Sequence, residues 1–219
     1  MNILFFDTAS SICSAAILAN GVVVAKNQKL ITNQHAEILV PMIEQILSDV
    51  KMDYNDLNLI STTIGPGSFT GIRIGLATAR GLSLACNIPL IGVTNFEVLA
   101  YAVERIDRVG RRILVILETK RDDFYTCVYS DKLDLIHGPM AIEGDALEKL
   151  SDPGRTIVLG DGVKRAMPFF SCSGTTLIRQ KTRRNIEFQI IADLVNDRFK
   201  LGSKLEKPAP MYINPPNIN

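Results

Sequence analysis

The sequence predicts an α/β protein, because segments typical of strands alternate along the chain with segments typical of helices. An apolar run at residues 2–6 is followed by two short β-prone runs at 13–18 and 22–26. Asn20 and Gly21, between the latter two, are a residue pair typical of a type I′ hairpin. Apolar residues make up 47% of the 219 positions, which is ample material for a buried core.

The later elements continue this alternation of strand and helix. In chain order we expect a helix at 34–50, a strand at 57–64, a helix at 70–85, strands at 88–93, 113–117, 124–129 and 157–159, and a last helix at 185–199. The segment 104–112 is densely charged and marks a domain boundary. We therefore expect an N-terminal lobe at 1–104, a smaller lobe at 105–185, and a C-terminal helix and tail at 186–219.

Charge, hydropathy and cysteine usage narrow the class of protein. The net charge is +1, from 24 basic and 23 acidic residues, so no overall basic field selects a nucleic acid. No signal-peptide pattern occurs, and no apolar run approaches the roughly 20 residues that a membrane span requires. The four cysteines (Cys13, Cys86, Cys127 and Cys172) form no Cys-x-x-Cys pair. We expect reduced thiols, no zinc site, no membrane partner and a cytoplasmic location.

The expected helix at 34–50 is apolar over a wide arc, with Asn33 as its N-cap and Pro41 as a kink. Its apolar positions are Ile38, Leu39, Met42, Ile43, Ile46 and Leu47. The helix at 70–85 carries small residues, namely Gly71, Gly75, Ala77, Ala79 and Gly81. Two such helices can form a four-helix bundle with the same pair from a second subunit, or can simply pack in their own core. His35 follows the N-cap, and we expect a hydrogen-bonded, structural ring there.

The most informative motif is the turn at 65–73, between the strand at 57–64 and the helix at 70–85. Its glycines (Gly65, Gly67 and Gly71) permit a sharp turn and close approach of the backbone, and the first amides of the helix can face an anion. The alternative is a tight turn without a ligand. No Lys-Ser or Lys-Thr pair follows, so the turn is neither a P-loop nor a dinucleotide fingerprint. Arg73 offers a planar charged fork to a phosphate or carboxylate.

The order of the elements resembles that of the bacterial TsaB (YeaZ) family. This order is a strand ending in Asp7-Thr8, a hairpin, a Pro-containing helix and the turn at 65–73. Further matching segments are His35 through Pro41-Met42-Ile43, Ala79-Arg80-Gly81-Leu82, and Met211-Tyr212-Ile213, the last as a terminal strand. The resemblance implies an actin/hexokinase/Hsp70-like fold. It also implies a non-catalytic part in threonylcarbamoyladenosine biosynthesis on tRNA, with a TsaD-type catalytic subunit and a TsaE-type ATPase as partners. The chain alone would form a homodimer, and tRNA would be met only through the complex.

Two sets of residues form the expected sites. We expect that no cofactor is bound tightly and that ATP or ADP binds at a contact between subunits. The nucleotide set is Asp7, Thr8, Gly65, Gly67, Ser68, Phe69, Thr70, Gly71 and Arg73. The partner set is His35, Leu39, Met42, Ile43, Ile46, Gly75, Ala77, Arg80 and Gly81. Asp7 could hold Mg²⁺-bound phosphate through water, with Asp161 as a second acidic site, or it could form an Asx turn. We expect no catalytic and no metal-binding residue.

The absence of a metal pair separates the chain from its catalytic relatives. They carry a His-x-x-x-His pair where this chain has Asn95 and Leu99, and Leu99 cannot bind a metal. A small-molecule kinase of the same superfamily and a metalloprotease are the alternatives, the latter without a zinc motif here. Between Arg179 and Lys207 eight basic residues face four acidic ones, which suits either tRNA phosphates or a solvated helix face.

Overall fold

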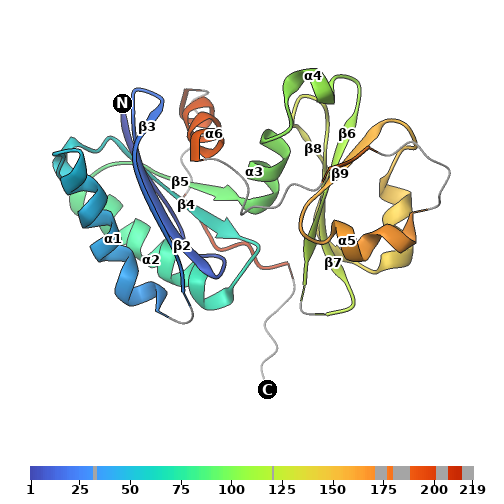
Figure 1. Cartoon of the computed structure of the whole chain (residues 1–219), viewed down its shortest axis with the longest axis horizontal. Helices are drawn as coiled ribbons and strands as arrows, with labels where there is room; N and C mark the ends of the chain where they lie inside the picture. Colours follow the sequence, from blue (N-terminus) through green and yellow to red (C-terminus); the bar gives the residue numbers. More distant parts are fainter. Residues whose placement is uncertain (32–33, 120, 171–176, 180–187, 201–206, 214–219) are drawn as a thin grey trace. The chain divides into compact units, whose positions relative to one another are not determined.

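The computed structural model describes residues 1–31, 34–119, 121–170, 177–179, 188–200 and 207–213 (Figure 1). The chain forms two compact units, of which the first is Met1–Asn95 with Glu187–Met211 and the second is Phe96–Ile186 with Tyr212–Asn219. The first unit thus ends before the charged 104–112 segment, and the C-terminal helix rejoins it. Expectations for Asn33, Cys172, Lys181, Arg183, Arg184 and Lys204 lie outside the described residues.

The first unit is built on a five-stranded sheet in the order β3-β2-β1-β4-β5. Its strands are β1 (Asn2–Asp7), β2 (Ile12–Ala19), β3 (Val22–Leu30), β4 (Leu59–Gly65) and β5 (Leu90–Thr94). β1, β2 and β3 are antiparallel neighbours, whereas β1, β4 and β5 run parallel. Asn20 and Gly21 have φ values of 53° and 83°, so the expected I′ geometry of the hairpin is confirmed.

Two helices, α1 (His35–Asp49) and α2 (Phe69–Cys86), pack on one face of this sheet (Figure 1). The core between them and the sheet includes Phe6, Ile17, Leu39, Ile43 and Ile60. Gln34, not Asn33, precedes the first helical residue of α1, and its side chain makes no capping hydrogen bond. α6 (Phe188–Lys200) belongs to the same unit, where the rings of Phe188 and Phe5 meet edge to face.

The second unit repeats the strand topology of the first. Its strands are β6 (Arg112–Glu118), β7 (Phe124–Tyr129), β8 (Leu135–Ile142), β9 (Thr156–Leu159) and β10 (Leu177–Arg179). Their order is β10-β9-β6-β7-β8, with β6, β7 and β8 antiparallel and β6, β9 and β10 parallel. In both units the first strand is therefore central, the next two follow on one side, and the last two follow on the other. The expected α/β class is confirmed.

The remaining helical elements are short. They are α3 (Asn95–Tyr101), α4 (Arg105–Arg108), α5 (Val163–Ala166) and 3-10 turns at Tyr54–Asp56, Gly144–Leu150 and Met167–Phe169. In the second unit, Leu114, Phe124, Val128 and Val158 form a core with α5 residues. The expected terminal strand at Met211-Tyr212-Ile213 is wrong, because these residues form no strand. A backbone hydrogen bond from Met211 N–H to the Ile64 carbonyl, at 2.8 Å, joins this segment to the sheet.

Candidate functional site

The glycines of the loop at 65–73 lie against the turn that follows β1. A Cβ at Gly67 would collide with the Ala9 carbonyl oxygen, and one at Gly71 would collide with the Thr8 carbonyl oxygen. A Cβ at Gly75, one turn further along α2, would lie 2.5 Å from the Thr8 hydroxyl. The close backbone approach that these glycines permit is therefore made to the protein's own chain. Because they pack against residues 8–9, their presence needs no ligand to explain it.

Hydrogen bonds tie the loop to the same turn. Ser68 N–H donates to the Ala9 carbonyl at 2.7 Å, and the buried Thr8 hydroxyl donates to the Gly71 carbonyl at 2.7 Å. The Ser68 hydroxyl caps α2 by accepting from Gly71 N–H at 3.2 Å. The amides of Ser68 and Gly71 are thus already bonded within the protein. This corrects the expectation that the first amides of the helix, these two among them, are open to an anion.

Asp7 lies at the carboxyl end of β1 and is buried. One carboxylate oxygen accepts from Ala9 N–H at 2.9 Å, which is the Asx-turn geometry considered from the sequence. Its negative charge also contributes, after burial, to raising the pKa of the Cys13 thiol to about 11. Asp161 belongs to the second unit, where its carboxylate accepts from Glu118 N–H at 2.9 Å. Each carboxylate therefore stabilises the turn after the first strand of its own unit.

The outer side of the loop offers polar and charged groups to solvent. Ser68, Phe69, Thr70 and Arg73 are all exposed. The Arg73 guanidinium lies over the Phe69 ring, 3.6 Å from its centroid, in cation–π geometry. Arginine and aromatic side chains of this kind are the residues that most often dominate binding interfaces. This Phe69–Arg73 pair, together with the exposed Gly67, Ser68 and Thr70, is the part of the predicted nucleotide set that remains accessible.

Asn95 supports the loop from the end of β5. It is buried, and its amide donates to the Pro66 carbonyl at 2.7 Å. Leu99, one turn further along α3, is fully buried. Neither side chain is an imidazole, so these two positions cannot bind a metal ion in the way expected of a His-x-x-x-His pair. The sequence drew attention to Asn95 because a histidine was expected at this position. Its hydrogen bond to the loop joins residues that are 29 positions apart, so the sequence could not predict it.

The partner set predicted on α1 needs correction. Leu39, Met42, Ile43 and Ile46 are buried in the core of the first unit, so in this structure they are not a docking surface. His35 is also buried, and its Nε2–H donates to the Ser10 carbonyl at 2.8 Å, which anchors the turn between β1 and β2. The sequence showed a wide apolar arc but not which neighbours cover it. The sheet and α2 cover it.

The predicted partner residues on α2, unlike those on α1, are mostly exposed. Gly75 is buried, whereas Ala77, Arg80 and Gly81 are exposed, and their role in partner binding stays a prediction. Leu84, on the same stripe, is 85% exposed and was not singled out from the sequence. We call Arg73, Ala77, Arg80, Gly81 and Leu84 the α2 stripe. We call Glu37, Val40, Pro41 and Glu44, which are exposed on α1, the α1 stripe.

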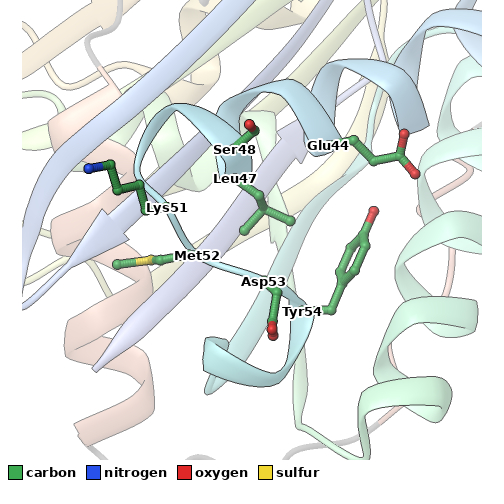
Figure 2. Close-up of a pocket in the computed structure, with 7 residues that line it drawn as sticks. All are labelled: Glu44, Leu47, Ser48, Lys51, Met52, Asp53 and Tyr54. Atoms are coloured by element: carbon green, nitrogen blue, oxygen red, sulfur yellow. The ribbon is translucent and has the colours of Figure 1, made fainter.

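A pocket of 470 Å³ lies at the C-terminal end of α1 (Figure 2). It is lined by Glu44, Leu47, Ser48, Lys51, Met52, Asp53 and Tyr54, with the Tyr54 hydroxyl pointing toward Glu44. Burial, followed by the nearby Glu44 charge, raises the pKa of Tyr54. The backbone N–H of Asn55 already bonds the Asp53 carboxylate, which caps the 3-10 turn. No residue of the predicted nucleotide set or of the predicted partner set lines this pocket.

Three further features of the described residues concern metal binding, cysteine pairing and membrane spanning. No group of three His, Cys, Asp or Glu residues in the described ranges converges as metal ligands would. Cys13, Cys86 and Cys127 are free thiols. No helix in the part of the chain that the structure describes is long and apolar enough to cross a membrane.

Comparison with solved structures defines the class of protein. YeaZ from Pseudomonas aeruginosa aligns with a TM-score of 0.76 at 21% identity, over 96% of this chain and 99% of that chain. A ROK family protein from Streptococcus pneumoniae aligns with a TM-score of 0.54 at 12% identity, over 91% of this chain and 100% of that chain. The protein is thus an α/β protein with the actin/hexokinase/Hsp70-like fold, as expected from the sequence.

Comparison of sequences gives the family. The family model described as "TsaD: tRNA N6-adenosine threonylcarbamoyltransferase" matches residues 22–202. The TsaB protein of Bacillus subtilis (strain 168) is 30% identical over 162 residues, covering 72% of this chain and 69% of that protein. The TsaB protein of Escherichia coli (strain K12) is 34% identical over 139 residues, which are 63% of this chain but 59% of that protein. The match to a third relative, TsaB from Buchnera aphidicola subsp. Baizongia pistaciae, spans 58% of that protein's length. The chain belongs to the bacterial TsaB (YeaZ) family, which is related to TsaD.

Proposed function

We propose that the protein takes part in the biosynthesis of threonylcarbamoyladenosine on tRNA as a non-catalytic subunit of the transferase complex. Support for the pathway comes from the family, whose curated members are named for this biosynthesis. The observation that carries the non-catalytic role is the pair Asn95 and Leu99. Asn95 holds the Pro66 carbonyl, and Leu99 is buried, so neither replaces the paired imidazoles of catalytic relatives.

The partner in this proposal is a TsaD-type catalytic subunit that docks on the α1 and α2 stripes. The α2 stripe carries Arg73 and Arg80, whereas the α1 stripe carries Glu37 and Glu44. Such opposite charges on two adjacent helices suit a related subunit that presents the same pair of helices in reverse order. The same complementarity supports a homodimer of the chain when the catalytic partner is absent. Exposed Leu84 and Val40 supply apolar area for either contact.

The proposal also includes a nucleotide, a TsaE-type ATPase and tRNA. ATP or ADP binds at the contact between subunits, beside the Phe69–Arg73 pair, and not to this chain alone. Support for that assignment is that the amides of Ser68 and Gly71 are already bonded within the chain. A TsaE-type ATPase joins the assembly, and tRNA is bound through the complex. Cytoplasmic location stays a prediction.

Reconstitution tests the proposal directly. Threonylcarbamoyl transfer to tRNA is measured with TsaD-type and TsaE-type subunits, with and without this chain, and with this chain alone. We expect transfer only when the chain and the catalytic subunit are both present. Full transfer without the chain would remove its role in the complex. Transfer by the chain alone would show that it is catalytic.

A further inference from the structure

The C-terminal segment at residues 207–211, which we call the strap, is fixed to the first unit at two points. The Arg80 guanidinium on α2 donates to the Pro208 carbonyl at 2.6 Å. Met211 N–H donates to the Ile64 carbonyl at 2.8 Å, directly before the loop at 65–73. The strap therefore connects the exposed side of α2 with the residue from which the loop starts.

Glycines in the sheet leave room for the strap. A Cβ at Gly92 in β5 would lie 2.8 Å from the Pro208 Cβ and 2.6 Å from the Ile64 Cγ2. A Cβ at Gly65 would lie 2.9 Å from the Met211 carbonyl oxygen, and Gly65 has a φ of 118°, which side chains rarely adopt. Both glycines lie where the strap crosses the carboxyl ends of β4 and β5. Larger residues at either position would push it away.

An irregularity in β4 provides the acceptor for the strap. The pairing of β4 with β5 shifts register between Thr63 and Gly65, so Ile64 has no partner in that ladder. Its carbonyl is thereby available to Met211 N–H. Bulges of this kind re-aim backbone groups at the ends of strands, and here the bulge receives the strap.

We propose that the strap is a conformational device that holds the loop at 65–73 in place, with Arg80 as its anchor. The loop is held from the β1 turn by Ser68 and Thr8, from α3 by Asn95, and at its start by Met211. Releasing the strap frees Ile64 and Gly65, and the position of the Phe69–Arg73 pair loosens with them. A consequence for partner binding rests on the proposed function above, because that pair lies on the proposed contact.

Hydrogen–deuterium exchange on the full isolated chain tests the strap without any partner. Wild type is compared with Arg80→Ala, and with Arg80→Lys as the conservative variant. In Arg80→Ala we expect roughly tenfold faster exchange in peptides covering 208–213 and 64–71, because a charge-assisted hydrogen bond is lost. The hairpin at 12–30 should exchange as in the wild type. Arg80→Lys should lie between the two.

Two exchange results would contradict the proposed role of the strap. Unchanged exchange at 208–213 would show that Arg80 does not anchor the strap. Faster exchange at 208–213 with unchanged exchange at 64–71 would show that the strap does not hold the loop. Arg105→Ala, an exposed arginine of the second unit, is the matched control and should change neither peptide.

A second variant connects the strap to partner binding. Gly92→Ala crowds both Pro208 of the strap and its acceptor residue Ile64 from within β5, and it substitutes no residue of either stripe. If the wild type binds the TsaD-type subunit, Gly92→Ala should bind roughly tenfold more weakly while its exchange at 64–71 rises. Equal binding despite faster exchange would remove the strap's part in docking. Absence of binding by the wild type would instead contradict the proposed function and leave the exchange result standing.

Discussion

At the scale of single residues, Gly71 and Gly81 lie on the same helix but under different constraints. A Cβ at Gly71 would collide with the Thr8 carbonyl, whereas one at Gly81 would meet no atom within 4 Å. Gly71→Ala should therefore lower the free energy of unfolding by about 1–3 kcal/mol through overpacking. Gly81→Ala should raise it by about 0.5–1 kcal/mol, because alanine favours the helix. Urea unfolding of the two variants measures both. Equal effects would show that the Thr8 contact does not constrain Gly71.

Arg73 is the residue whose side chain most directly tests the proposed contact. It is exposed and stacked on Phe69, so Arg73→Ala should change the free energy of unfolding by no more than about 1 kcal/mol. The rate of reconstituted tRNA modification should fall about tenfold. Arg73→Lys should recover only part of this rate, because an ammonium cannot stack or form a bidentate contact as a guanidinium does. Wild-type modification by Arg73→Ala would show that the loop is only a turn.

At the scale of elements, the exposed stripes replace the apolar arc of α1 as the proposed docking surface. Leu84→Asp should weaken binding of the TsaD-type subunit by about 100-fold, because an unpaired carboxylate would be buried in the contact. Since Leu84 is 85% exposed, stability should change by no more than about 0.5 kcal/mol. Titration calorimetry measures the affinity, and sedimentation of the chain alone reports any homodimer.

Ile106→Asp is the matched control, because Ile106 is 81% exposed but lies on α4 of the second unit. It should bind as the wild type does. Met42→Asp is unsuitable for this purpose, since Met42 is buried and the carboxylate would disrupt folding. Wild-type affinity in Leu84→Asp would place the docking surface elsewhere.

Most elements could be predicted, because periodicity and turn chemistry are local. The hairpin at Asn20 and Gly21 and both long helices lie within one or two residues of their expected positions. β8 was missed, since Gly138 and Pro139 interrupt its pattern as turn residues do. The terminal segment was expected to be a strand, yet the described residues 207–213 form none, and Met211 instead bonds the Ile64 carbonyl at the irregularity in β4.

At the scale of the whole molecule, the two units share one strand order and one kind of buried thiol. Burial raises the pKa of Cys13 and of Cys127 from 9.0 to about 11. Because each folded-state pKa lies above the unfolded value, the thiols contribute stability below pH 9 that is lost as pH rises to 11. We expect each to account for a loss of ~2 kcal/mol over that interval. Denaturant unfolding at both ends of the interval measures it.

The double variant Cys13→Ala/Cys127→Ala provides the comparison. It should be less stable at neutral pH, since two buried sulfurs are removed, but should lose less stability between the two pH values. Other groups whose pKa is raised, such as Tyr54, remain in both proteins and cancel in the difference. An identical pH dependence would show that the thiols do not titrate with unfolding.

The sequence alone determined the class of fold, most element positions and the family, because these depend on local periodicity, turn residues and a contiguous motif. Only the tertiary structure decided which surface each residue faces. The apolar arc of α1 is covered by a sheet built from distant segments, and the glycines of the loop lie against Thr8 and Ala9. Burial and close packing depend on neighbours far away in the chain. Therefore only the tertiary structure could show that the accessible parts of the predicted sites are residues 67–70 and 73 of the loop together with Ala77, Arg80 and Gly81 on α2.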